Sequence, residues 1–192
     1  MAMLQAAPDF VLFAAYNRWM NARLYAAAAT LPEAELARDR GAFFGSILGT
    51  LNHLVVADTI WLQRFATLPA QHAALDPVRA LPAPERLDDM PFPEFDALAA
   101  HRRWLDAIIE RWVSVLGEAD LGHVLHYGNT RGARFRRQLA PLLLHFFNHQ
   151  AHHRGQATTL LSQAGVDVGV TDLLVLIPDV DADADTNAPH PH

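Results

Sequence analysis

Four long stretches with helical spacing of apolar residues set the main limit on what this chain can fold into. They cover residues 9–29, 43–67, 93–116 and 137–164. Asp9 is a suitable N-cap for the first stretch, and Gly165 is a typical residue directly after a helix. Four helices of this length predict an all-α protein that folds as a four-helix bundle.

The connections between these stretches suggest how the helices are ordered. Residues 69–92 contain five prolines, so we expect a long connection with little regular structure. Such a connection can cross the bundle and leave the second and third helices parallel. Residues 122–136 read as two short strands around Gly128-Asn129-Thr130-Arg131, which predicts a small hairpin before the last long helix.

The C-terminal part of the sequence changes in character. Residues 171–177 form a short apolar segment that we expect to pack back on the bundle. Residues 179–192 are acidic and contain proline, which is typical of a disordered tail. We therefore expect one domain over residues 1–178 followed by this tail.

Composition excludes several classes of protein. The chain has no cysteine, which excludes disulfides, iron–sulfur clusters and cysteine nucleophiles. Its net charge of −6 argues against a nucleic-acid binder. The chain has one short basic cluster, which we interpret as a solvated surface; it comprises Arg131, Arg134, Arg136 and Arg137. We see no signal peptide and no apolar run of the ~18 residues that a membrane helix needs. We therefore expect a cytoplasmic protein with no membrane partner.

Four of the eleven histidines fall in the fourth predicted helix, at positions 145, 149, 152 and 153. At about 100° per residue they share one face of that helix with Leu142 and Leu160. Burying several imidazoles is costly unless each finds a partner. His149 and His153 have the i, i+4 spacing that lets two imidazoles bind one metal ion. The alternative is a row of hydrogen-bonded core histidines.

His53 is the best candidate for a third ligand, because it is the only histidine in the second predicted helix. Its neighbours on that face, Gly49, Thr50 and Ala57, are small and would leave space for an ion, while Leu54 and Trp61 would wall that space. His145 and His152 are competing ligands, and we assign them to the pocket. We place the remaining histidines at the surface or in the tail (His72, His101, His190, His192) or leave them open (His123, His126).

At these residues the sequence resembles the DinB-like superfamily of metal-binding helical bundles. The resemblance covers roughly residues 8–178 and rests on three motifs: Tyr16-Asn17-Arg18-Trp19-Met20-Asn21, Ser46 to Asp58 around Asn52-His53, and Phe147-Asn148-His149-Gln150-Ala151-His152-His153-Arg154-Gly155-Gln156. It implies an up-down-down-up bundle that binds zinc or nickel through His53, His149 and His153. It also implies a homodimer. Family members of known activity are thiol-dependent S-transferases and isomerases.

These observations lead to one main functional hypothesis and two alternatives. The main hypothesis is a metal-dependent enzyme that activates a low-molecular-weight thiol toward a small electrophile, with His152 or His145 as proton shuttle. Arg154 or Arg64 would bind a carboxylate of the substrate. The alternatives are a hydrolase that uses a metal-bound hydroxide and a non-catalytic metal-binding or stress-response protein. For the hydrolase, the nearest carboxylate is Asp58, which points about 140° away from His53 on its helix.

Overall fold

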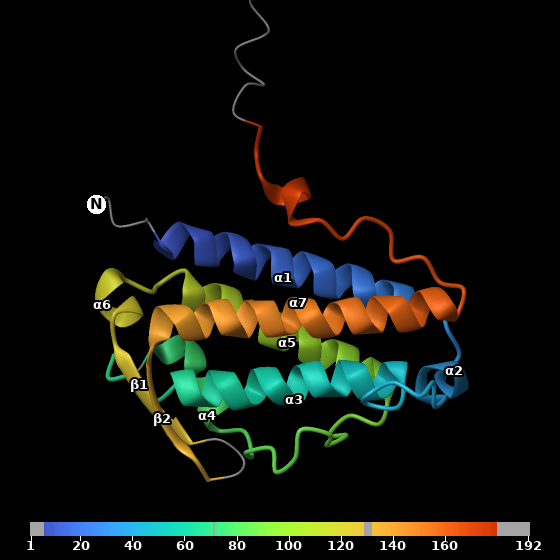
Figure 1. Ribbon diagram of the computed structural model, residues 1–192, viewed down its shortest axis with the longest axis horizontal. Helices are drawn as coiled ribbons and strands as arrows, with labels where there is room; N and C mark the ends of the chain where they lie inside the picture. Colours follow the sequence, from blue (N-terminus) through green and yellow to red (C-terminus); the bar gives the residue numbers. More distant parts are fainter. Residues whose placement is uncertain (1–5, 71, 129–131, 180–192) are drawn as a thin grey trace, which may run out of the picture.

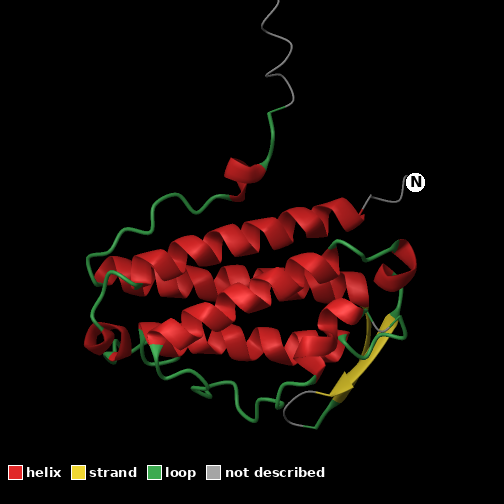
Figure 2. Ribbon diagram, turned by 180° about the vertical axis from the view of Figure 1, so that it is seen from behind, coloured by secondary structure: helices red, strands yellow, loops and turns green. Residues whose placement is uncertain are grey.

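The computed structural model describes residues 6–70, 72–128 and 132–179, and it is a helical bundle with a hairpin at one end (Figures 1 and 2). The four long helices are α1 (Ala6–Ala28), α3 (Ile47–Phe65), α5 (Phe95–Val113) and α7 (Leu139–Gln163). The short elements are α2 (Glu33–Ala37), η1 (Ala73–Leu75), α4 (Asp76–Arg79), α6 (Glu118–Leu121), β1 (Val124–Gly128), β2 (Arg134–Gln138) and η2 (Leu173–Leu176). The predicted all-α class is confirmed.

The side-chain contacts between helices give their directions. Asn17 and Tyr25 of α1 meet Asp106 and Phe95 of α5, so these two helices run antiparallel. The helices α3 and α5 run parallel, because Asp58 and Phe65 meet Arg102 and Trp112 in the same order. The contacts His53–His153 and Trp61–His145 make α3 and α7 antiparallel, and Phe10–Phe147 with Asn17–Arg154 make α1 and α7 parallel. The order is therefore up-down-down-up.

The second helix begins later than the sequence predicts. Residue 43 was the expected start, but α3 starts at Ile47 because Ser46 caps it, accepting a hydrogen bond from the Gly49 amide at 2.9 Å. Residues 38–46 instead form a turn with a bridge between Ala42 and Gly45. The long connection also differs from expectation, because it contains η1 and α4.

The hairpin forms where the sequence predicts it. The strands β1 and β2 pair antiparallel, with Leu125 opposite Arg137 and Tyr127 opposite Phe135. Figure 2 shows this hairpin across one end of the bundle. Leu125 is buried, and Tyr127 packs on Trp61 of α3. The predicted turn at 129–131 lies outside the described residues.

The core combines aromatic packing with a buried polar network. Phe65 stacks on Trp112 and meets Phe146 edge-on, which joins α3, α5 and α7. Nearby, buried polar side chains from all four long helices contact one another: Asn17, Asn21, Asp58, Arg102, Asp106, Gln150 and Arg154. Among the described helices, none is long and apolar enough to cross a membrane.

The segment after α7 lies along α1, as Figure 1 shows. The Tyr16 hydroxyl donates to the Thr171 carbonyl at 2.6 Å, and Arg23 donates to the Val168 carbonyl at 3.1 Å. These bonds hold the backbone of the segment, whereas no side chain of η2 is buried. Packing of residues 171–177 on the bundle is therefore weaker than predicted. The predicted tail from residue 180 on, with His190 and His192, lies outside the described residues.

Candidate metal centre

Three histidines from two helices converge at one point between α3 and α7. His53 comes from α3, and His149 and His153 come from successive turns of α7. The Nε2 atom of His153 lies 3.3 Å from Nε2 of His53 and 3.1 Å from Nε2 of His149. Two nitrogens that bind one tetrahedral zinc ion at the usual bond length are about 3.3 Å apart. The three predicted ligands thus form a group that could bind a metal ion.

The hydrogen bonds on the far side of two rings indicate which nitrogen carries the proton. Nδ1 of His53 lies 2.8 Å from the Leu87 carbonyl, which can only accept, so this Nδ1 is protonated. Nδ1 of His153 lies 2.8 Å from Oε1 of Gln156 and donates in the same way. Both Nε2 atoms then present lone pairs to each other. Two facing lone pairs repel each other, and a cation between the two nitrogens would remove this repulsion. The donor set therefore fits a metal ion.

The surroundings keep the three imidazoles uncharged. Burial lowers the pKa of His53 to about 4 and the pKa of His149 to about 3, and it also lowers the pKa of His153. The neighbouring histidines lower the pKa of each ring further. Metal ions bind neutral imidazole, so the group is in its ligand form at neutral pH.

Phe44 covers the group on one side. Its ring stacks on His53 with 3.8 Å between ring centroids and meets His153 edge-on at 5.6 Å. This contact depends on Gly49, because a Cβ there would overlap the carbonyl oxygen of Phe44. The sequence suggested that the small side chain of Gly49 leaves space for the ion. That interpretation is wrong for Gly49, because the backbone of residue 44 fills the space.

The other pocket residues lie next to the group but outside it. His145 is exposed on α7, with its ring 5.9 Å from His149 and 5.0 Å from Trp61. The protein atoms around its ring displace part of its hydration and lower the pKa of His145, and the nearby Arg137 and Arg64 lower it further. His152 is exposed, and its ring lies 4.8 Å from the ring of His153. Both imidazoles belong to α7 and lie beside the histidine group.

Three polar residues to which the sequence analysis gave possible roles at the site lie elsewhere in the structure. Asp58 is buried and accepts hydrogen bonds from Arg102 and Gln150, so it is not free to act as a base. Arg154 is buried and donates to Asn17. Within the Tyr16 to Asn21 motif, Asn17 and Asn21 therefore lie in the polar core, whereas Arg18 is exposed and pairs with Glu110. Arg64 lies beside the hairpin, where it donates to the Gly128 carbonyl at 2.8 Å.

Two histidines assigned to the surface are partly buried instead. His72 packs near α6, with Nε2 3.2 Å from Oδ1 of Asp120. His101 lies between the rings of Phe92 and Trp104. Both assignments were wrong because they rested on position in the sequence alone. The sequence analysis assigned no position to His123 and His126. In the structure His126 is exposed and His123 is partly buried.

Three groups at the site were missed by the sequence reasoning. Gln156 was already part of the histidine motif and of the same helix face, but its hydrogen bond to His153 was not predicted. Phe44 was assigned to a helix, which hid its role as a cover. The Leu87 carbonyl carries no side-chain signal, since any residue could supply it.

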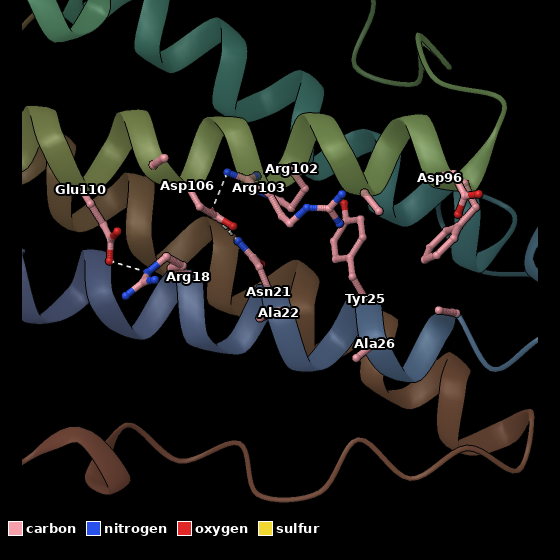
Figure 3. Close-up of a pocket in the computed structure, with 14 residues that line it drawn as sticks. Arg18, Asn21, Ala22, Tyr25, Ala26, Asp96, Arg102, Arg103, Asp106 and Glu110 are labelled. Carbon is pink, nitrogen blue, oxygen red and sulfur yellow. Dashed lines mark hydrogen bonds and ion pairs between the residues drawn. The ribbon is translucent and has the colours of Figure 1, made fainter.

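The largest cavity described lies away from the histidines, between α1 and α5 (Figure 3). It has a volume of about 560 Å³. Its floor consists of Asn21, Tyr25, Arg102 and Asp106, which belong to or adjoin the polar network (Figure 3). The Tyr25 hydroxyl has no hydrogen-bond partner among the described residues, but it is covered by protein atoms and a ligand in the cavity cannot reach it. We therefore place the candidate site at the histidines.

Comparison with known proteins agrees with this geometry. The sequence model of the DinB family matches residues 3–179. Protein DinB of Bacillus subtilis (strain 168) is 26% identical over 160 residues, which cover 82% of this chain and 87% of that protein. Because the family match spans nearly the whole described chain, this protein belongs to the DinB family.

Proposed function

We propose that this protein is a metal-dependent enzyme that binds one zinc or nickel ion through His53, His149 and His153 and activates a low-molecular-weight thiol. The supporting observation is the pair of unprotonated Nε2 atoms 3.3 Å apart on His53 and His153. Imidazole nitrogens suit both metals. Three protein ligands are typical of catalytic sites, which keep a position open for a substrate.

A divalent ion at this position would favour the thiolate form of a bound thiol, whose free pKa is about 8.5. The thiol proton passes to the imidazole of His152 or His145. The sulfur then forms a bond to the electrophilic carbon, and the leaving group departs with the electrons of the bond that breaks. Phe44 keeps water away from one side of the ligands.

The position of Asp58 disfavours the hydrolase alternative. Such an enzyme usually needs a carboxylate as general base. Asp58 is committed to Arg102 and Gln150 in the core. No other carboxylate of the described residues forms part of the histidine group.

The metal content of the purified, untagged protein tests the site. We expect about one ion per chain in the parent and none in His53→Ala, His149→Ala or His153→Ala. The matched control is His152→Ala, which removes an exposed histidine of the same helix and should keep the ion. A metal-free parent under replete conditions, or three substitutions without effect, would refute the site. Metal loss in His152→Ala would indicate a closed site with four protein ligands, which is structural rather than catalytic.

The thiol chemistry needs its own assay. The metal-loaded protein is mixed with cysteine, glutathione or coenzyme A and 1-chloro-2,4-dinitrobenzene, and thioether formation is followed by absorbance. We expect a rate above the uncatalysed reaction that disappears in His53→Ala. Stoichiometric metal without turnover across an extended panel would favour the non-catalytic alternative.

We also propose that the protein forms a homodimer. Apolar side chains near the C-terminal end of the described chain are 47–73% exposed, and a partner would cover them; they are Val170, Leu174, Val175 and Ile177. Light scattering measures the mass in solution. A Leu174→Glu substitution should shift the protein toward the monomer, and a monomeric parent would contradict the proposal.

A further inference from the structure

A second cavity lies at the hairpin end of the bundle, between the C-terminal half of α3, residues 83–84 and strand β1. Its volume is about 390 Å³. Gln63, Arg64 and Thr67 line it from the helix side, and His126 and Tyr127 line it from the strand. Arg64 lies eleven residues after His53 on α3, which corresponds to about 16 Å along the helix axis. None of the three histidines of the candidate metal centre lines this cavity.

Arg64 is the charged group of this cavity, and other protein groups leave most of its hydrogen-bonding capacity unused. Its guanidinium lies over the rings of Trp61 and Tyr127, at 4.7 and 5.1 Å from their centroids. It donates one hydrogen bond, to the Gly128 carbonyl. A guanidinium has five N–H donors arranged as a fork that matches two acceptor oxygens. No carboxylate of the described residues forms an ion pair with it.

The charges around the cavity favour an anion as the missing partner. Among its lining residues none is acidic, although the chain carries a net charge of −6. Arg136 stands opposite His126 in the strand register but does not line the cavity. Gln63 donates to the Leu81 carbonyl and Thr67 donates to the Arg64 carbonyl, and neither side chain carries a charge that could neutralise the guanidinium. Partial burial lowers the pKa of Arg64.

We propose that this cavity is an anion-binding site in which Arg64 binds the carboxylate or phosphate group of a small molecule. The aromatic rings of Trp61 and Tyr127 hold the guanidinium in place, so little side-chain freedom is lost on binding. A carboxylate or phosphate would accept two parallel N–H bonds from the fork.

The test uses the full chain after treatment with EDTA, so that no metal ion can bind the probes. Succinate and inorganic phosphate are titrated separately, and ¹H–¹⁵N spectra are recorded. We expect saturable shifts of the backbone signals of Thr67, His126 and Gly128. Arg64→Gln should weaken binding of the preferred probe at least tenfold, because hydrogen bonds to charged groups are lost. Arg64→Lys, which keeps the charge but not the fork, should bind with intermediate affinity.

The matched control is Arg103→Gln, which removes the same charge from an exposed position on α5. It should bind the probe as the parent does. Equal weakening in Arg103→Gln and Arg64→Gln would mean that only net charge matters and would overturn the proposal. So would a parent that shows no saturable shifts with either probe. Preference for succinate identifies a carboxylate site, and preference for phosphate identifies a phosphate site. His53→Ala should bind the anion as the parent does. Loss of metal binding and loss of anion binding can therefore be told apart.

Discussion

Replacing Asp58 by asparagine tests whether the buried polar network determines the stability of the bundle. One oxygen of this carboxylate accepts hydrogen bonds from Arg102 of α5 and Gln150 of α7, and all three residues are buried. In Asp58→Asn the side chain keeps its shape but loses its charge. Arg102 then keeps a single carboxylate partner, that of Asp106.

The expected cost follows from this loss. Removing one partner of a buried ion pair costs about 3–5 kcal/mol. The new amide oxygen can still accept one hydrogen bond, so we expect the lower end, about 3 kcal/mol. For a chain of this size that corresponds to a melting temperature lower by about 6–12 °C. Urea denaturation followed by circular dichroism measures the free energy of unfolding, with an unchanged m-value as the sign of a purely energetic effect.

Asp96→Asn is the matched control for this experiment. It removes the same charge from an exposed position in the first turn of α5 and should change stability by less than about 0.5 kcal/mol. Asp58 also joins the helices that carry the metal ligands, so Asp58→Asn should weaken metal binding in the folded protein. A loss of stability below about 1 kcal/mol would show that Asp58 contributes little and would refute the reasoning.

Three further predictions concern the cover of the site, the ion and pH. Gly49→Ala should destabilise the protein and weaken metal binding, because the added Cβ would displace Phe44. Gly155→Ala on α7, where a Cβ meets open space, should instead raise stability by up to about 1 kcal/mol. Denaturation and metal titration check both substitutions. Metal at about 100 times its dissociation constant should raise stability by about 2.7 kcal/mol, measured as a shift in melting temperature that is absent in His153→Ala. Burial lowers the pKa of His101 to about 4, so the parent should lose stability as pH falls from about 6.5 toward 4. In urea titrations His101→Phe should lose less stability over that range. Equal losses in the parent and the variant would contradict this prediction.

Much of the fold could be predicted because long helices carry repeated signals. Each of the four bundle helices has several turns of apolar residues at helical spacing, and errors are confined to their ends. The start of α3 is the clearest case, because the cap at Ser46 outweighs the apolar residues that precede it. The short helices α2, α4 and α6 went unpredicted, since four or five residues give too few turns for a pattern.

The candidate site could be predicted as far as its side chains have distinctive chemistry. The i, i+4 spacing brought His149 and His153 together on one face, and His53 stood out as the only histidine of its helix. The backbone partner at Leu87 and the cover at Phe44 come from connections, whose paths follow no periodic pattern. For the same reason the partial burial of His72 could not be foreseen, because it depends on where α6 lies.

His53 and His153, the proposed metal ligands, are 100 residues apart in the sequence, and this separation affects when the site can form. During synthesis α3 emerges long before α7. His53 therefore has no contact with His149 and His153 until α7 has packed against α3. Metal uptake should therefore follow complete folding rather than guide its early steps. An ion bound by His53, His149 and His153 would link α3 to α7, so its presence should slow the separation of these two helices.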